Sequence, residues 1–356
     1  MNFERALLCG LGNTGSALLP LLAALPGLRE VVLVDRDRIE RANLACQAGL
    51  TAADVGRSKA RVHARRLRGL RPGLKVVAYE QDLARIPLGE WHGALVAGCL
   101  DNNEARVVLN AGAFRARAAL LLDLGVRADN RLARVSVLHP CRAGSACLEC
   151  SWSEADYSPA RHACAPPAPA SGASAALGAL AASLAMLEIE KLRDSALEPV
   201  AREVVVCADS HEIFSSALHR RSACRFEHSA LNLSTAPLSL DATTLGEFFH
   251  LASVRGATAM RVEGRFYHPP LSCSAGCGGR LAPGFRPRGG GGVCQVCGRP
   301  SAGAAAFQCQ TVLAQAEWPP LLGIPLSRLG LRDRDVITLA AADGQPSSFL
   351  ITLTSS

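Results

Sequence analysis

The stretch ALLCGLGNTGSALLPLLAALPGLREVVLVDRDRIERAN, residues 6–43, decides the fold of this chain. Three glycines near its start separate two apolar runs, and the second run ends on Asp35. This pattern predicts a strand, a glycine turn, a helix and a second strand. The glycines are Gly10, Gly12 and Gly15.

Such a unit is suited to a nucleotide. Its glycines let the backbone approach a phosphate, and the helix N-terminus offers free N–H groups. An acid that closes the second strand, here Asp35, can accept hydrogen bonds from ribose hydroxyls. The spacing therefore predicts a nucleotide site and leaves open whether the ligand is an NAD-type cofactor or ATP. The structural alternative is a glycine turn that only packs strand on helix.

Length and composition predict a large globular protein of the cytoplasm. The chain has 356 residues, of which 49% are hydrophobic, enough for one large α/β domain and a smaller appendage. Its net charge of +7 permits an acidic or phosphorylated partner without requiring one. The Ala-rich run at residues 173–187 is shorter than the ~20 residues that span a bilayer, and no signal-peptide pattern is present. We therefore expect a cytoplasmic protein without membrane association.

Apolar runs alternate with helical patterns through the first third of the chain. The runs lie at residues 74–79, 94–100 and 119–124, after the two already described. This alternation predicts an α/β fold with a doubly wound, mostly parallel, Rossmann-like sheet. Ligand groups gather at the carboxyl ends of such strands, where Asp35 and Asp101 stand.

Four motifs carry a resemblance to a known family. They are Gly10-Leu11-Gly12-Asn13-Thr14-Gly15-Ser16, Asp35-x-Asp37-x-Ile39-Glu40-x-x-Asn43-Leu44-x-x-Gln47, Gly56-x-x-Lys59, and Asp101-Asn102 with Arg106. Over roughly residues 5–230 the chain resembles the ThiF/MoeB/HesA adenylyltransferases, which are related to ubiquitin-activating enzymes. The resemblance implies a ThiF-type adenylation domain that binds ATP rather than NAD.

The resemblance also implies roles for individual residues. Asp35 would bind the ribose, Asn43 and Lys59 the triphosphate, and Asp101 a Mg²⁺ ion. A lysine charge and a carboxylate-held metal would neutralise the phosphates and the departing pyrophosphate. The implied nucleotide contacts are Gly10, Gly12, Asn13, Gly15, Asp35, Asp37, Asn43, Gln47, Lys59, Asp101, Asn102 and Arg106.

Two arginines of the family pattern are missing. The family usually reads N-L-x-R-Q, but position 46 is cysteine here, and almost nothing precedes the first strand, where many members carry another arginine. Arg38, Arg41 or Arg57 could supply a substitute charge, and spacing does not choose among them. The N-L-x-x-Q form resembles activating enzymes of bacterial ubiquitin-like conjugation operons.

A first zinc site is predicted within the resembling region. The family pairs its C-x-x-C with a second pair about 70 residues later, and Cys147, Cys150, Cys224 and His228 stand at these places. Four such ligands suit a closed structural zinc. The alternative is two buried cysteines and an exposed histidine.

A second zinc site is predicted near the C-terminus. Cys273-x-x-x-Cys277 and Cys294-x-x-Cys297-Gly298 are spaced as in a zinc ribbon. The arginines of the intervening loop have no interleaved aromatic residues, so we expect packing or partner docking rather than nucleic-acid binding.

Cys164 is the candidate nucleophile. It lies in a Pro- and Ala-rich stretch whose position resembles the loop of ThiF-like proteins that carries a reactive cysteine before a small-residue helix. The neighbouring Arg161 and His162 would favour its thiolate. The alternative is a loop cysteine without a role.

These observations predict a domain order and a function. We expect an adenylation domain at residues 1–232, a connecting α+β segment at 233–270, a zinc ribbon at 271–300 and a strand-containing tail at 301–356, with strands at 336–339 and 349–353. The predicted protein is an activating enzyme, a homodimer that adenylates the C-terminal carboxylate of a small ubiquitin-like or sulfur-carrier protein. Cys164 would capture the product as a thioester, and a ubiquitin-conjugating-like protein could follow as partner. The alternatives are adenylation of a small molecule or tRNA base, and an inactive nucleotide-binding scaffold.

Overall fold

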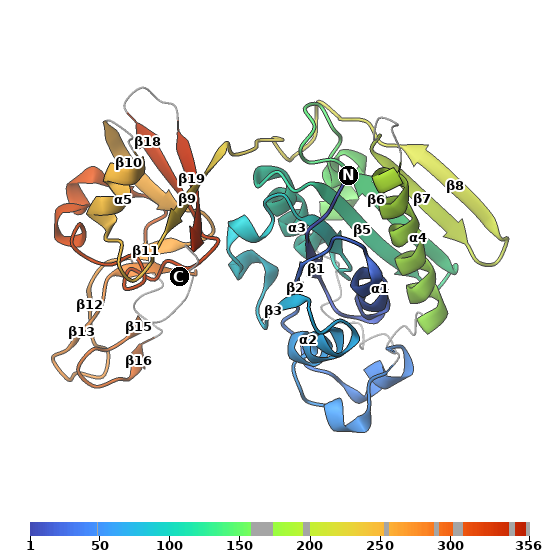
Figure 1. Ribbon diagram of the computed structural model, residues 1–356, viewed down its shortest axis with the longest axis horizontal. Coiled ribbons are helices and arrows are strands. Elements are labelled where there is room, and N and C mark those ends of the chain that lie inside the picture. Colours follow the sequence, from blue (N-terminus) through green and yellow to red (C-terminus); the bar gives the residue numbers. More distant parts are fainter. Residues whose placement is uncertain are drawn as a thin grey trace. The chain divides into compact units, whose positions relative to one another are not determined.

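The computed structural model describes residues 1–47, 49–157, 174–194, 200–252, 256–287, 292–301, 309–341 and 346–353. The chain forms two compact units (Figure 1). The first comprises Met1–Ala84 and Glu90–Ala230, and the second comprises Arg85–Gly89 and Leu231–Ser356.

The first unit is built on an eight-stranded sheet. Its strands are β1 Arg5–Cys9, β2 Glu30–Val34, β3 Lys75–Tyr79, β4 Leu95–Gly98, β5 Leu120–Arg127, β6 Leu132–Leu138, β7 Arg202–Cys207 and β8 Glu212–Ala217. Their order is β3-β2-β1-β4-β5-β6-β7-β8, parallel from β3 to β5 and antiparallel from β5 to β8. The predicted α/β fold with a mostly parallel sheet is confirmed.

Helices cover both faces of this sheet. The helices are α1 Asn13–Ala24, α2 Lys59–Leu70, α3 Asn103–Arg115 and α4 Ala175–Asp194. Apolar side chains of α1, α2 and α4 share one core with alternate strand residues, Ala97 of β4 among them. The next residue, Gly98, faces the other way, and an added Cβ there would overlap Leu109 of α3. Since successive strand residues point to opposite faces, α3 covers the second face.

The glycine turn joins β1 to α1 through two close approaches. Gly10 has a φ of +88°, and an added Cβ would overlap the carbonyl oxygen of Cys99. A Cβ on Gly15 would overlap the carbonyl oxygen of Gly10. Only glycine permits this packing, because any side chain would separate the turn, the helix and β4.

The second unit contains a five-stranded sheet of order β17-β10-β18-β19-β9. One helix, α5 Leu245–Ala252, contributes Phe248 to the apolar core of this unit. The strands are β9 Leu233–Leu238, β10 Ala257–Val262, β17 Leu313–Ala314, β18 Val336–Ala341 and β19 Ser347–Leu353. The strands predicted at 336–339 and 349–353 are present as β18 and β19. They share this sheet with β9 and β10, which come from the predicted connecting segment.

Three two-stranded ladders lie between β10 and β17 in the chain. They pair β11 Phe266–His268 with β14 Gly284–Arg286, β12 Leu271–Ser272 with β13 Arg280–Leu281, and β15 Gly292–Val293 with β16 Pro300–Ser301. Among the helices that the structure describes, none combines the length and apolar character needed to cross a membrane.

Candidate functional site

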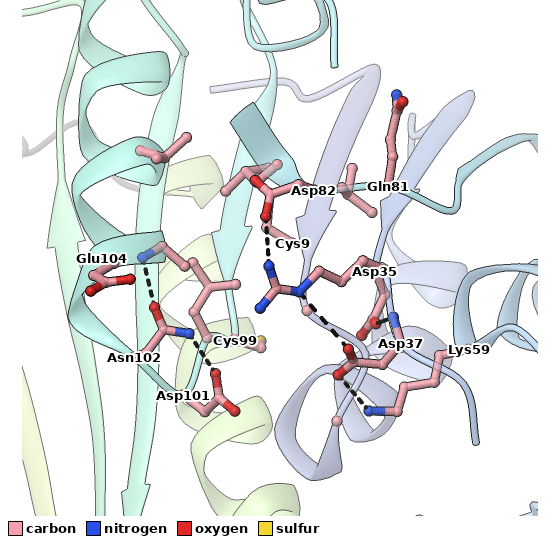
Figure 2. A pocket seen from close by; sticks show the side chains of 18 residues that line it. Cys9, Asp35, Asp37, Lys59, Gln81, Asp82, Cys99, Asp101, Asn102 and Glu104 are labelled. Atoms are coloured by element: carbon pink, nitrogen blue, oxygen red, sulfur yellow. Dashed lines mark hydrogen bonds and ion pairs between the residues drawn. The ribbon is translucent and has the colours of Figure 1, made fainter. Parts of the chain in front are cut away.

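A pocket of about 440 Å³ lies in the first unit, beside the residues that follow β1, β2, β3 and β4 (Figure 2). It gathers most of the predicted nucleotide contacts. Its lining includes Gly10, Gly12, Asp35, Asp37, Lys59, Asp101 and Asn102. These residues are far apart in the sequence and meet because parallel strands present their carboxyl ends at one edge of a sheet.

Gly12 leaves open space at one end of the pocket. It is the N-cap residue of α1, and an added Cβ would meet no atom of the described residues within 4 Å. Among the described residues, none fills the space beside Gly12 at the start of this helix. The N–H groups of a first helical turn and the positive end of the helix dipole attract an anion such as a phosphate.

Asp35 ties the end of β2 to the glycine turn. Its Oδ2 accepts a hydrogen bond from the Leu11 N–H at 2.7 Å, and its Oδ1 accepts one from the Asp37 N–H at 2.8 Å. Burial raises the pKa of the Asp35 carboxyl, although these hydrogen bonds and the charge of Lys59 act in the opposite direction. A carboxylate has about four acceptor positions, so Asp35 can also accept hydrogen bonds from a ribose.

Alternating charges cross the pocket. Lys59 Nζ lies 3.1 Å from Asp37 Oδ2, and Arg36 Nε lies 4.0 Å from Asp37 Oδ1. Arg36 Nη1 then donates to Asp82 Oδ2 at 2.8 Å. Arg36 and Asp82 line the pocket, and neither is among the predicted nucleotide contacts. Their position could have predicted that they line it, since both residues closely follow a predicted strand.

The three arginines proposed as substitute charges lie elsewhere. Arg38 donates to the Gly56 carbonyl oxygen at 2.8 Å. The described residues that line the pocket do not include Arg38, nor do they include Arg41 and Arg57, which are exposed. Among the described residues that line the pocket, the arginine is Arg36.

Asp101 and Asn102 stand where β4 leads into α3. Asn102 caps the helix, because its Oδ1 accepts from the Ala105 N–H at 2.8 Å, and its Nδ2 donates to Asp101 Oδ1 at 2.9 Å. The Asp101 side chain is exposed, and Glu104 also lines the pocket. Carboxylate oxygens of this kind suit Mg²⁺.

Five of the implied nucleotide contacts do not line the pocket: Asn13, Gly15, Asn43, Gln47 and Arg106. Asn13 Nδ2 donates to the Ser174 carbonyl oxygen at 3.1 Å, and Asn43 Oδ1 accepts from the Glu40 N–H at 2.9 Å. Gln47 is buried, with Oε1 lying 3.2 Å from His63 Nε2. These contacts stabilise the surrounding loops, and the direct nucleotide roles of the five residues stay predictions.

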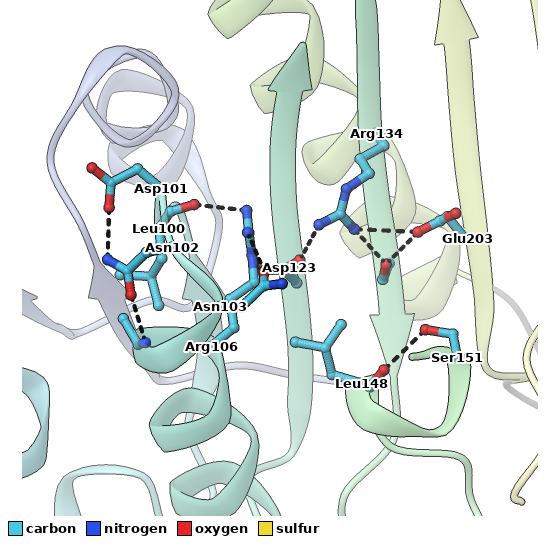
Figure 3. A network of polar contacts seen from close by, with 12 residues as sticks. Leu100, Asp101, Asn102, Asn103, Arg106, Asp123, Arg134, Leu148, Ser151 and Glu203 are labelled. Carbon is cyan, nitrogen blue, oxygen red and sulfur yellow. Dashed lines mark hydrogen bonds and ion pairs between the residues drawn. The ribbon is translucent and has the colours of Figure 1, made fainter. Parts of the chain in front are cut away.

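Arg106 belongs to a network of polar contacts beside the pocket (Figure 3). It donates to the Leu100 carbonyl oxygen at 2.7 Å and to Asp123 Oδ1 at 3.1 Å. Asp123 is fully buried on β5, and its Oδ2 accepts from Arg134 at 2.8 Å. Arg106 therefore holds the backbone just before Asp101 and compensates a buried carboxylate, which would be costly alone.

The comparisons with known proteins agree with this geometry. The model of the ThiF family matches residues 1–225. This chain belongs to the ThiF family. In the ThiF-family region it is 33% identical over 150 residues to mouse adenylyltransferase and sulfurtransferase MOCS3, covering 40% of this chain and 30% of that protein. It is 35% identical over 112 residues to the SAMP-activating enzyme E1 of Haloferax volcanii, covering 30% and 40%.

Further relatives extend the comparison. Molybdopterin-synthase adenylyltransferase of Salmonella typhimurium is 30% identical over 131 residues, or 36% of this chain and 52% of that protein. The matches thus span between 30% and 52% of these three relatives. A crystal structure of E. coli MccB with MccA-N7isoASN superposes with a TM-score of 0.50 at 22% identity, covering 62% of this chain and 66% of that one. This likeness shows the fold.

The ThiF-family unit also brings its four predicted metal ligands together. The ligand atoms of Cys147, Cys150, Cys224 and His228 all lie within 4.8 Å of one another. Cys147 Sγ lies 3.8 Å from Cys150 Sγ and 3.6 Å from Cys224 Sγ. Tetrahedral zinc with Zn–S bonds of about 2.3 Å would separate its sulfurs by about 3.8 Å. The four side chains fit one such ion.

The second unit contains a matching cluster. Cys273, Cys277, Cys294 and Cys297 also have ligand atoms within 4.8 Å of one another. The Sγ distance is 3.7 Å between Cys273 and Cys297 and 3.6 Å between Cys277 and Cys294. Backbone N–H groups lower the pKa of the Cys294 thiol, which favours the thiolate that binds metal.

Cys164 lies outside the described residues, as do Arg161 and His162. The residues on either side of that segment are described. Asn103, next to the pocket residue Asn102, donates to the Asp156 carbonyl oxygen at 2.9 Å, and Asn13, next to Gly12, donates to Ser174. Both flanks of the Cys164 segment are therefore fixed close to the pocket.

Proposed function

We propose that this chain is an ATP-dependent activating enzyme that adenylates the C-terminal carboxylate of a small ubiquitin-like or sulfur-carrier protein. The observation that carries the proposal is a single pocket with four complementary parts. They are the open helix end at Gly12, the ribose-suited Asp35, the cation Lys59 and the exposed carboxylate of Asp101. The names of the relatives, which denote adenylyltransferases and activating enzymes, support the same reading.

The first step needs positioning and charge neutralisation. A carboxylate oxygen of the carrier forms a bond to the α-phosphorus of ATP, and the bond between that phosphorus and pyrophosphate breaks. A magnesium ion, when bound, neutralises the departing pyrophosphate. Asp101 would hold that ion, while the first N–H groups of α1 and the Lys59 ammonium would bind phosphate oxygens.

Lys59 could exchange its ion-pair partner, Asp37, for a phosphate group. Its ammonium is paired with Asp37, and its side chain is 12% exposed. A triphosphate carries more charge than one carboxylate and would replace Asp37 as the partner of Lys59. NAD offers no triphosphate for this group, and we infer that the pocket takes ATP.

The second step would transfer the carrier to a thiol. The sulfur of Cys164 attacks the acyl carbon, AMP leaves, and a thioester forms. The fixed flanks of its segment beside Asn102 and Gly12 support this assignment.

Cys164→Ala is predicted to separate the two steps. Pyrophosphate exchange should stay within several-fold of wild type, since its groups lie in the sheet, whereas the thiol-sensitive adduct with the carrier should disappear. Exchange assays and non-reducing gels measure the two. Cys141→Ala removes an exposed cysteine from the ThiF-family unit and should change neither. An adduct that persists in Cys164→Ala would place the nucleophile elsewhere.

We propose further that both cysteine clusters bind zinc, the second as a zinc ribbon. Purified protein should contain two zinc ions per chain by elemental analysis. Cys150→Ser and Cys297→Ser should each lose one ion, because each removes a ligand from a different cluster. A single zinc in the wild-type protein would refute one assignment. Chelation should release the second cluster first, since its ligands come from one short segment, residues 273–297.

An inactive nucleotide-binding scaffold is the second candidate. Cysteine at position 46 favours it, because the family pattern has an arginine there. Such a scaffold would bind MgATP and would catalyse no pyrophosphate exchange with any carrier. A homodimer and a ubiquitin-conjugating-like partner are part of the main proposal, and chromatography with light scattering tests the first.

A further inference from the structure

An ion pair between the ends of two neighbouring strands is left unused by the function proposed above. Arg36 follows β2. Asp82, which is labelled in Figure 2, lies a few residues after β3. Arg36 Nη1 lies 2.8 Å from Asp82 Oδ2, and both residues line the pocket. Neither belongs to the motifs that carry the family resemblance.

The order of the strands indicates which end of a bound nucleotide would lie beside Arg36 and Asp82. The sheet runs β3, β2, β1, and the glycine turn follows β1 while Asp35 follows β2. Neighbouring strands lie about 4.8 Å apart. If the phosphates lie at α1 and the ribose at Asp35, the base would lie beside the end of β3. Leu83, which follows Asp82, gives the pocket an apolar contact there.

Asp82 is held by two hydrogen bonds. Its Oδ1 accepts from the Ala84 N–H at 3.0 Å, while its Oδ2 accepts from Arg36. The carboxylate therefore fixes one edge of the guanidinium group. Asp37 lies farther away, with its Oδ1 at 4.0 Å from Arg36 Nε. The hydrogen bond to Asp82 uses an N–H group, which lies in the plane of the guanidinium, so this partner does not cover a face of the group.

Guanidinium faces stack on flat aromatic systems, including nucleobases. The Arg36 side chain is 66% exposed, so its plane is accessible from the pocket. Its attachment to Asp82 restricts the side chain before a ligand binds, which lowers the entropy lost on stacking.

Resting on the proposed function, we propose that Arg36 is a base-binding residue of this pocket. Its guanidinium stacks on the nucleobase of the bound nucleoside triphosphate, and Asp82 is the positioning residue that holds the guanidinium in place. The phosphates are bound by the separate groups at Gly12, Lys59 and Asp101. Arg36 thus contributes to nucleotide affinity through the base and not through the triphosphate.

Calorimetry with two probes tests this division. The probes are ATP and inorganic tripolyphosphate, each with Mg²⁺, of which the second has the phosphates and lacks the base. Arg36→Met keeps the length of the side chain and removes the plane and the charge. It should weaken ATP binding about 5- to 10-fold and leave tripolyphosphate binding within twofold. The control Arg38→Met, in which an arginine outside the pocket lining is changed, should alter neither.

Asp82→Asn tests the positioning role. It should weaken ATP binding less than Arg36→Met does, and it should add no further loss when Arg36 is already methionine. Full additivity of the two changes would show that Asp82 acts independently of Arg36.

Three results would contradict the proposal in different ways. Equal weakening of ATP and tripolyphosphate by Arg36→Met would make Arg36 a phosphate ligand and overturn the assignment to the base. Unchanged binding of both probes would remove Arg36 from the site. Failure of the wild-type protein to bind ATP would overturn the proposed function together with this inference.

Discussion

Asp101→Ala is expected to reduce carrier-dependent exchange of pyrophosphate into ATP by at least about 100-fold, the usual cost of losing one well-placed electrostatic group. The side chain is exposed at the pocket, and its hydrogen bond with Asn102 is the contact that the change removes. Asn102 would still cap α3 through the Ala105 N–H. The thermal midpoint should therefore stay close to that of the wild-type protein.

The matched control for this change is Asp129→Ala. Asp129 is also exposed and pairs with Arg127 across a surface turn, away from the lining of the nucleotide pocket. Its removal should leave exchange unchanged. If Asp101→Ala retained near wild-type exchange, the metal-holding role of Asp101 would be wrong, whatever the function of the protein.

Gly12→Val should abolish nucleotide binding while the protein stays folded. The added side chain would enter the space in front of α1, where phosphates are expected, and its Cβ would meet no atom within 4 Å in the part of the chain that the structure describes. Gly12 has a φ of −73°, which valine can adopt. We expect the Kd for MgATP to rise by at least about 100-fold and stability to fall by up to about 1 kcal/mol, as for an unfavourable N-cap.

Gly73→Val provides the comparison for Gly12→Val. A Cβ on Gly73 also meets no atom within 4 Å, and this glycine is not among the pocket-lining residues. Both variants should unfold at similar temperatures, and MgATP binding should be lost in Gly12→Val alone. Tight binding of ATP by Gly12→Val would mean that the phosphates lie away from the end of α1.

The sequence predicted the parallel half of the first sheet well, because its strands are continuous apolar runs buried on both faces. It did not predict how the C-terminal strands combine. Strand β9 pairs with β19, although about a hundred residues separate them in the chain. Such a pairing depends on the packing of the whole unit, and no local pattern records it.

Asp35 and Asp101 were predicted from their places at the ends of strands, and Asp37 and Lys59 were predicted through the family resemblance. Asp35, Asp37, Lys59 and Asp101 reach one pocket because each follows a strand or begins a helix there. Arg36 was missed, since consecutive residues after a strand point in directions that depend on the loop.

Arg106, which was predicted at the nucleotide, compensates the buried Asp123, and its contact with a nucleotide stays a prediction. A single acid within the apolar run LLLDL is the signal that could have predicted a buried arginine partner.

The metal ligands illustrate the same distinction. The spacing within each cysteine pair is local and was readable from the sequence. The meeting of Cys147 and Cys150 with Cys224 and His228 joins segments more than 70 residues apart. That meeting was predicted through the family resemblance, and the distances now support it.

The central claim is that this ThiF-family chain activates a protein carboxylate. Its most direct test is intact-mass spectrometry of small proteins ending in Gly-Gly, encoded near this gene, after incubation with the enzyme and MgATP. The account predicts a carrier whose mass increases by one AMP group, or a carrier joined to the enzyme through a thiol-sensitive bond, and neither product with Asp101→Ala. Binding of MgATP without any carrier adduct or exchange, across all such candidates, would contradict it and favour the scaffold.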